Sequence, residues 1–439
     1  MRGDSRAGLT MIVALAACGA DEPAGVAGLF TPAVIASSTT SNGATPMFAV
    51  TPAGAQVLSW VAAGDSSDLE RLHVEVRHPD GTVQRAVLTD PLGSIEPHGE
   101  SPPQVVAGPD GAIHALYTVG RDVGKRFPES ALRYARSTDG GLAWSTPVSI
   151  NEGEAFGSHN FHALLAGEGG KLHAAWLSSI RGTSAVWIRH STDGGRTWLP
   201  AQTLHEAPTC PCCRTGLAVD SAGTLYASWR KIFPGDVRDV VVARSADGGA
   251  TWQEPVRPRH DEWVFPGCPH AGPSLRTGPD GAVHIAWWTG VAGEAGVWYA
   301  RSVDGGVTWN AQPIAIGAQS MPAHVQLAID RQGAVLLAWD DGLGERPIVT
   351  LRASPDGGAS FLAPHVLSDP SLAATYPVLG IAGDSVVVAW TQVADAAHRA
   401  MLAERPDMDD PASRMPLPRV GQQEVVVRKA ALEALLRRD

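Results

Sequence analysis

Four cysteines near the middle of the chain have the spacing that most directly implies chemistry. Cys210, Cys212 and Cys213 fall within four residues, and Cys268 precedes His270 by two positions. In an exported protein an even count of cysteines first suggests disulfides, with Cys268 bridged to one of the other three. Thiolates with a nearby imidazole are also ligands for soft or borderline ions, so a copper or zinc site is the second interpretation. Free or redox-active thiols are a third interpretation.

Charged side chains and one tyrosine form a second group of candidates. Two arginines and two carboxylates lie in or beside loops near the cysteines, and a tyrosine lies near a late strand entry. Carboxylates can serve as general acids and bases, and arginine binds carboxylate groups of substrates. The alternative for each is an ordinary solvated loop charge. The catalytic candidates are Asp239, Asp261, Arg230, Arg238 and Tyr376.

A repeated turn must position these side chains. The pattern Ser-x-Asp-Gly-Gly-x-x-Trp occurs four times, and a weaker fifth copy ends in Phe. Successive aspartates are 54, 54, 57 and 52 residues apart, and a period near fifty predicts a propeller or another repeat array. The aspartates are Asp139, Asp193, Asp247, Asp304 and Asp356.

Each part of the repeated turn has a structural role. Paired glycines allow positive φ, the aspartate accepts hydrogen bonds from turn amides, and the tryptophan anchors the turn on apolar surface. A turn present in every unit stabilises the repeat, so we expect it to do no chemistry.

The pattern resembles the Asp-box, or bacterial neuraminidase repeat, of sialidases and other Asp-box propellers. This resemblance implies an all-β fold and a glycan-directed function, and any enzyme would be an exo-sialidase-like glycoside hydrolase. The Arg-Ile-Pro motif of sialidases is missing near the first strand, which reads Pro46-Met47-Phe48. The Cys-Pro-Cys-Cys motif, with Arg238-Asp239 and 261–263, resembles a bacterial lipoprotein subgroup known by its sequence.

Strand patterns predict a single β-propeller of four-stranded blades. Seven blades are favoured, and six, as in sialidases, are the alternative. The last unit lacks a fourth strand, and 29–34 is expected to supply it and close the ring. Sites are expected on the face opposite the Asp-boxes, among the blade connections. Each predicted second strand contains an aromatic residue: Trp60, Tyr117, Trp176, Trp229, Trp287 or Trp288, Trp339, and Trp390.

The two ends of the chain differ in composition from the repeats. Arg2 and Arg6 precede a short apolar run that ends in Leu15-Ala16-Ala17-Cys18, which resembles a bacterial lipobox. We expect residues 1–18 to be a lipoprotein signal peptide with lipidation at Cys18, with a plain secretory signal as the alternative. The remaining expected divisions are a linker over 19–28, the propeller over 29–405 and an irregular tail over 406–439, with a strand and short helix possible within 424–438.

Composition and net charge limit the classes of partner that the protein can bind. The net charge of −11 gives no basic footprint for nucleic acid, and no apolar run is long enough to span a bilayer. We expect an exported monomer of the cell envelope that meets a glycan or cell-surface ligand and is attached to the membrane through Cys18. Three hypotheses remain: a glycan-directed propeller, a metal- or thiol-bearing propeller, and an interaction scaffold stapled by disulfides.

Overall fold

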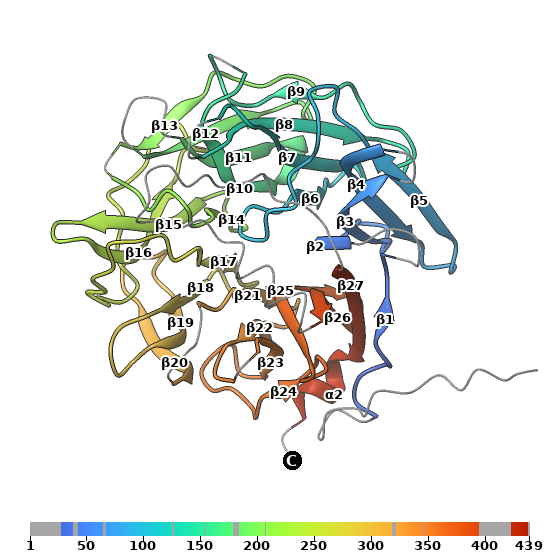
Figure 1. Cartoon of the computed structure of the whole chain (residues 1–439). Coiled ribbons are helices and arrows are strands. Elements are labelled where there is room, and N and C mark those ends of the chain that lie inside the picture. Colours follow the sequence, from blue (N-terminus) through green and yellow to red (C-terminus); the bar gives the residue numbers. More distant parts are fainter. Residues whose placement is uncertain are drawn as a thin grey trace, which may run out of the picture.

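The computed structural model is a seven-bladed β-propeller, as predicted, with the sheets arranged around a central axis (Figure 1). Within the part of the chain that it describes, six sheets have four strands and one has three. No helix among those residues is long and apolar enough to cross a membrane. The described residues are 28–37, 43–64, 67–124, 127–153, 155–178, 184–206, 208–317, 322–344, 346–394 and 423–437.

Each of blades 1 to 6 is an antiparallel meander whose first strand lies innermost. Blade 1 has β2 (Gly43–Val50), β3 (Gln56–Gly64), β4 (Ser67–Arg77) and β5 (Val83–Leu88). Blade 2 has β6 (Gln104–Ala107), β7 (Ile113–Arg121), β8 (Glu129–Ser137) and β9 (Val148–Ser149), and blade 3 has β10 (His159–Ala166), β11 (Leu172–Ser178), β12 (Ala185–Ser191) and β13 (Gln202–His205). Blade 4 has β14 (Gly216–Val219), β15 (Leu225–Phe233) and β16 (Val237–Ser245). Blade 5 has β17 (Ser274–Thr277), β18 (Val283–Thr289), β19 (Gly296–Ser302) and β20 (Asn310–Ile316), and blade 6 has β21 (Gln326–Ile329), β22 (Val335–Asp341), β23 (Ile348–Ser354) and β24 (His365–Val366).

Blade 4 is the three-stranded sheet. A single bridge between Val242 and Val256 occupies the place of its fourth strand. The chain then leaves the sheet and forms the long connection that carries Cys268 and His270 into blade 5.

Blade 7 closes the ring with strands from both ends of the chain. It contains β25 (Leu372–Ala382), β26 (Ser385–Ala394), β27 (Gln423–Ala431) and β1 (Val34–Ile35). Val34 pairs with Val427 and Ile35 with Val426, so the N-terminal segment supplies the fourth strand as predicted.

The third strand of blade 7 corrects the expected boundary at 405. It lies at 423–431, within the expected tail, and α2 (Leu432–Leu436) follows it, which matches the strand and short helix considered for 424–438. The strand forms because Val425 and Val426 are almost fully buried and Val426 pairs with Trp390 of β26. The propeller therefore includes β27.

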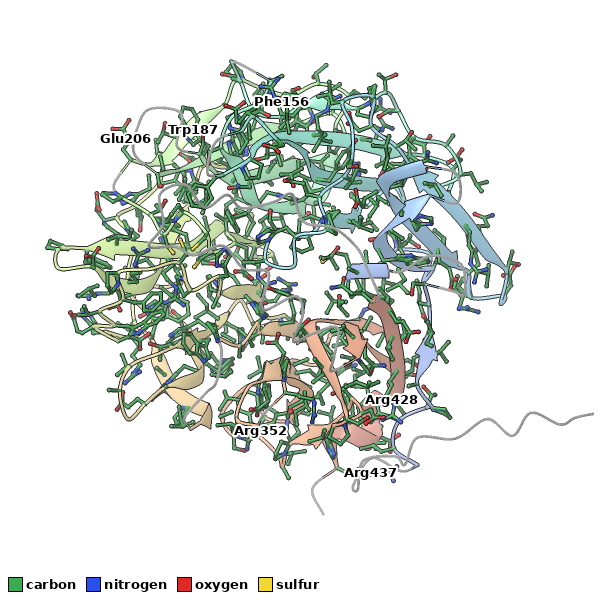
Figure 2. The ribbon with its side chains drawn as sticks, in the orientation of Figure 1. Phe156, Trp187, Glu206, Arg352, Arg428 and Arg437 are labelled. Carbon is green, nitrogen blue, oxygen red and sulfur yellow. The ribbon has the colours of Figure 1, made fainter. Side chains whose placement is uncertain are left out.

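The core lies between neighbouring blades, where side chains fill the space between the sheets (Figure 2). Every predicted second-strand aromatic lies in a second strand and is buried. Burying one large apolar side chain contributes about 1.5–3 kcal/mol, so this row is a main source of stability. Partly buried arginines add links between blades: Arg352, labelled in Figure 2, donates to the carbonyls of Ile314 in blade 5 and Leu362 in its own blade.

The Asp-box turns are capped by their own residues, as predicted. In the blade 3 copy, Ser191 Oγ donates to Asp193 Oδ1 at 2.9 Å and accepts from the amide of Gly195 at 2.9 Å. Asp193 Oδ1 also accepts from the amide of Thr197 at 2.9 Å. The hydrogen bonds from the side chain and amide of Thr197 lower the pKa of Asp193 to about 2. The other four boxes have the same serine–aspartate bond.

Each box also packs against the preceding blade. Trp198 meets Tyr134 of blade 2 edge-on, with ring centroids 5.0 Å apart. Gly195 has φ of 76°, and a Cβ there would lie 1.8 Å from the Tyr134 hydroxyl. All five boxes lie on third-to-fourth turns, which places them on the face away from the blade connections.

Candidate functional site

Segments that enter different blades meet at the propeller axis on the face opposite the boxes. The ring of His98, before blade 2, lies 5.7 Å from that of His270, before blade 5. A Cβ on Gly99 would lie 2.2 Å from the ring of Tyr376, in blade 7. These blades are not neighbours in the ring, so their side chains touch only across the axis. We call this set the channel mouth; it consists of His98, Glu100, Phe161, His270, His324 and Tyr376.

Aromatic and imidazole rings form the surface of the channel mouth. His98 meets Phe161 edge-on at 5.4 Å, and the rings of His324 and Tyr376 lie 3.9 Å apart. His98, His270 and Tyr376 are half-buried, whereas Phe161 and His324 are buried. Burial lowers the pKa of His98 to about 3 and also lowers that of His270, so both rings are neutral near pH 7.

His324 and Asp340 form a buried ion pair behind these rings. His324 Nδ1 lies 2.6 Å from Asp340 Oδ2, and its Nε2 donates to the carbonyl of His270 at 2.9 Å. Because a carbonyl only accepts, both ring nitrogens carry protons when Asp340 is ionised. Burial opposes this charge, but Asp340 outweighs it and the pKa of His324 is raised. Asp340 also accepts from the amide of Tyr376 at 3.1 Å, which links blades 6 and 7.

Glu100 is the fully buried carboxylate of the channel mouth. Its Oε1 accepts from the amide of Arg214 at 3.1 Å and from the amide of Gly272, so one side chain joins blades 2, 4 and 5. Its Oε2 is buried and has no hydrogen-bond partner among the described residues. Native proteins leave few buried polar atoms unpaired, and such atoms concentrate at functional sites.

The backbone is strained at the same place. Phe161, His270 and Tyr376 have φ of 54°, 50° and 51°, in the left-handed region that non-glycine residues rarely adopt. Phe161 and Tyr376 lie within register shifts of β10 and β25. Such outliers persist where surrounding structure enforces them and cluster at ligand sites.

The cysteines converge beside the channel mouth, on the connections into blades 4 and 5. The sulfurs of Cys210, Cys212 and Cys213 all lie within 4.8 Å of one another, and all three side chains are buried. Cys210 Sγ lies 3.6 Å from that of Cys212 and 3.2 Å from that of Cys213. Cys268 is exposed and lies outside this three-sulfur group, and the neighbouring Cys212 lowers the pKa of its thiol.

All four of these cysteines are free thiols in the structure, so the disulfide expectation finds no support in it. Hydrogen bonds from Cys212 and Cys213 lower the pKa of Cys210, with the positive charge of Arg230 acting in the same direction. The pKa of Cys212 is raised by its hydrogen bonds to Cys210 and the other thiols, and burial raises that of Cys213. His270, the predicted nitrogen ligand, lies outside the three-sulfur group and donates from Nδ1 to the carbonyl of Cys268.

The two predicted catalytic carboxylates are held by protein donors. Asp239 is fully buried and accepts from Arg257 Nη1 at 2.9 Å and from the amide of Trp263 at 3.2 Å. Asp261 accepts from Arg259 at 2.7 Å and from the indole of Trp287 at 2.8 Å. These bonds fasten the 257–263 segment to blades 4 and 5.

The two predicted catalytic arginines also bond to the protein. Arg230 is fully buried and donates to the carbonyls of Arg238, Ala271 and Trp288 at 2.7–2.9 Å. Arg238 donates to the carbonyl of Phe265 at 2.5 Å and to Cys210 Sγ at 3.4 Å. Of the five catalytic candidates, only Tyr376 lies in the channel mouth, and Cys18 lies outside the described residues.

A separate cavity of about 250 Å³ opens between the inner strands farther along the axis. Phe48, Leu379 and Gly380 line it with apolar surface, and Arg276 supplies a positive charge. It contains none of the candidate residues.

Comparison with known proteins supports the repeat assignment. Residues 82–262 match the family model described as a BNR repeat-like domain, which confirms the repeats predicted from the Asp-boxes. None of the curated proteins matches this chain.

Similar solved structures share the fold at low identity. A polysaccharide lyase of family PL25, an ulvan lyase, superposes with a TM-score of 0.55 at 15% identity, covering 80% of this chain and 92% of the lyase. The Hadza microbial sialidase Hz136 has a TM-score of 0.47 at 17% identity, with coverages of 85% and 75%. NanB sialidase from Streptococcus pneumoniae, as its K499G mutant, has a TM-score of 0.47 at 13% identity, with coverages of 91% and 70%. At 15% identity the likeness to the lyase shows the fold alone.

Proposed function

We propose that this BNR-repeat propeller is glycan-directed and that it binds a saccharide at the channel mouth. The observation that carries the proposal is the meeting of half-exposed rings from non-adjacent blades: His98, His270 and Tyr376. Aromatic side chains with a few well-placed polar groups are the usual lining of a small-ligand site. The CH-rich face of a pyranose packs against such rings.

The groups behind the rings would orient the ligand. Glu100 places a carboxylate beside His270 and His324; its charge opposes the lowering of the His270 pKa by burial and contributes to the raised pKa of His324. The ring of His324 packs against that of Tyr376 at a tilt of 36°, and Asp340 holds both residues in place. In this arrangement Tyr376 contacts the ligand, whereas Glu100 and Asp340 are positioning residues.

Binding is better supported than sialoside hydrolysis. A sialidase site needs several arginines free to clamp the substrate carboxylate, together with a tyrosine nucleophile. Arg230, Arg238, Arg257 and Arg259 are all bonded to carbonyls or carboxylates of the protein. The channel mouth supplies a tyrosine without an arginine clamp among the described residues.

The test is calorimetric titration of the purified protein with sialyllactose, a uronate-containing oligosaccharide and a neutral oligosaccharide, with release of reducing sugar assayed in parallel. Tyr376→Ala should weaken the affinity for the bound probe by about tenfold, since an aromatic contact is worth about 0.5–1.5 kcal/mol. His98→Ala should act in the same direction, and Asp193→Ala on the opposite face is the control. Equal affinity of wild type, Tyr376→Ala and His98→Ala would refute the site, and no binding to any probe would refute the function.

We extend the proposal to location: the protein is exported and attached to the bacterial envelope through a lipid on Cys18. The support is the sequence of 15–18 and its charged, apolar leader. Metabolic labelling with a radioactive fatty acid should mark the wild type and leave Cys18→Ser unlabelled. Labelling of Cys18→Ser, or none of the wild type, would refute the anchor.

A further inference from the structure

We infer that Cys210, Cys212, Cys213 and Cys268 form a thiolate site for one thiophilic d¹⁰ cation, zinc or copper(I), which ties together the connections into blades 4 and 5. The inference stands apart from the proposed glycan function, and either can fail alone. Three features support it: the positions of the sulfurs, the positive charges beside them and the backbone hydrogen bonds that hold the two connections.

The sulfur positions fit one ion. A tetrahedral zinc with Zn–S bonds of about 2.3 Å sets its sulfurs about 3.8 Å apart. Cys210 Sγ lies 3.6 Å and 3.2 Å from the sulfurs of Cys212 and Cys213, and all three lie within 4.8 Å of one another. Shifts of a few tenths of an ångström would seat an ion among these three, and the exposed Cys268 side chain, which lies outside the group, would have to move to supply the fourth sulfur.

The surrounding charges also fit. Arg238 Nη1 lies 3.4 Å from Cys210 Sγ, and the buried Arg230 acts on the same sulfur. Both guanidiniums bond to backbone carbonyls, and neither has a carboxylate within ion-pairing distance in the described part of the chain. By contrast, Arg257 and Arg259 nearby pair with carboxylates. Buried charges need compensation, and a divalent ion with four thiolates carries two negative charges, which balances these two arginines.

The backbone around the site is already fixed. The amide of Cys210 donates to the carbonyl of Arg230 at 2.8 Å, and the amide of Arg238 to that of Trp263 at 2.8 Å. Three sulfurs therefore come from a loop held against β15, and the fourth comes from the connection held against β16. Since Cys268 precedes His270 by two residues, the ion would also fix the strained entry that places His270 in the channel mouth.

The first experiment is elemental analysis of the full chain purified anaerobically with a reductant, followed by a thiol count. One equivalent of zinc or copper per chain is expected, with the thiols protected until a chelator is added. The identity of the element distinguishes the two ions. The inference would be overturned if the chain held no metal after reconstitution with either ion. It would also be overturned if the protein purified under reducing conditions contained two disulfides.

The second experiment uses cobalt(II) as a spectroscopic probe of the thiolate ligands. The wild type should develop thiolate-to-cobalt charge-transfer absorption, which zinc or copper(I) then displaces. Cys210→Ser should lower cobalt affinity by at least about 100-fold, whereas Thr209→Ala, a buried neighbour without a thiol, should leave it unchanged. If Cys210→Ser fails to fold, a chelator is added to the folded, cobalt-loaded wild type instead. Removal of the cobalt should then abolish the charge-transfer absorption. A spectrum without charge-transfer bands would overturn the inference.

Discussion

The two faces of this propeller are built in different ways. On the Asp-box face each turn is capped by residues within eight positions of one another, as in 191–198, and the device recurs in five blades. On the other face the channel mouth is assembled once, from residues of different blades such as Glu100, His270 and Tyr376. Repeated local capping builds the scaffold, whereas single long-range contacts build the candidate site.

The comparison is tested most strongly by removing Asp340, which serves only the channel mouth. Asp340→Ala leaves His324 buried without its counter-ion and removes the acceptor of the Tyr376 amide. Breaking a buried pair from one side costs about 3–5 kcal/mol, so we expect the free energy of unfolding to fall by about 4 kcal/mol. Denaturant titration measures this change. Asp280→Asn, which affects an exposed pair with Arg301, is the control, and an equal effect of the two would contradict the role of Asp340.

The scaffold face is tested next by Gly195→Ala. Alanine there is strained by the positive φ and meets the Tyr134 hydroxyl, so we expect a loss of about 3 kcal/mol with glycan affinity unchanged. The matched control is Gly223→Ala, where φ is 82° and nothing lies within 4 Å of the added Cβ. If both variants lose the same stability, packing of the box against the neighbouring blade contributes nothing.

A smaller effect is expected for Asp193→Ala, which removes the cap and leaves the backbone free of new contacts. The melting temperature should fall by a few degrees, with ligand affinity unchanged, because the lost bonds are exposed and local. Scanning calorimetry measures the melting temperature, and calorimetric titration with the glycan measures the affinity. Selective loss of binding at unchanged stability would mean that the box takes part in recognition.

The smallest expected effect is a difference between the two faces in how their contributions to stability depend on pH. The pKa of His324 is raised in the folded protein, so its pair with Asp340 contributes fully below about pH 6.5 and is lost as pH rises through the folded pKa. The pKa of Asp193 is lowered to about 2, so its contribution is present above about pH 4 and is lost as pH falls toward 2. Unfolding measured from pH 2 to 9 should show both losses. Asp340→Asn should remove only the alkaline one, and persistence of that loss would contradict the assignment.

The accuracy of the sequence-based predictions follows the same division. The Asp-boxes and the second-strand aromatics depend on neighbours close in sequence, and the structure confirms both. The closing strand at Val34 was also predicted, from what blade 7 lacked. The expected end of the propeller at 405 was too early because β27 begins 29 positions after β26 ends, and spacing offered no guide across that interval.

The channel mouth could be predicted only in outline. The position of the Asp-boxes indicated the right face, opposite them among the blade connections. A carboxylate such as Glu100 gave no signal that it would cross the axis to Gly272. Asp239 and Arg230 have residue types suited to catalysis, yet both bond to the protein itself. A sequence does not distinguish a charge that the fold has already neutralised from one left open to a ligand.

The pairing of β1 with β27 in blade 7 affects both folding during synthesis and mechanical unfolding. During translation six blades can form in order, but β26 has an unpaired edge until 423–431 leaves the ribosome, and β1 has nothing to pair with before then. Residues 34 and 35 make only two paired positions with β27. A pull on the N-terminus therefore loads this short strand pair first, and we expect the ring to open between β1 and β27 while blades 1 to 6 remain folded.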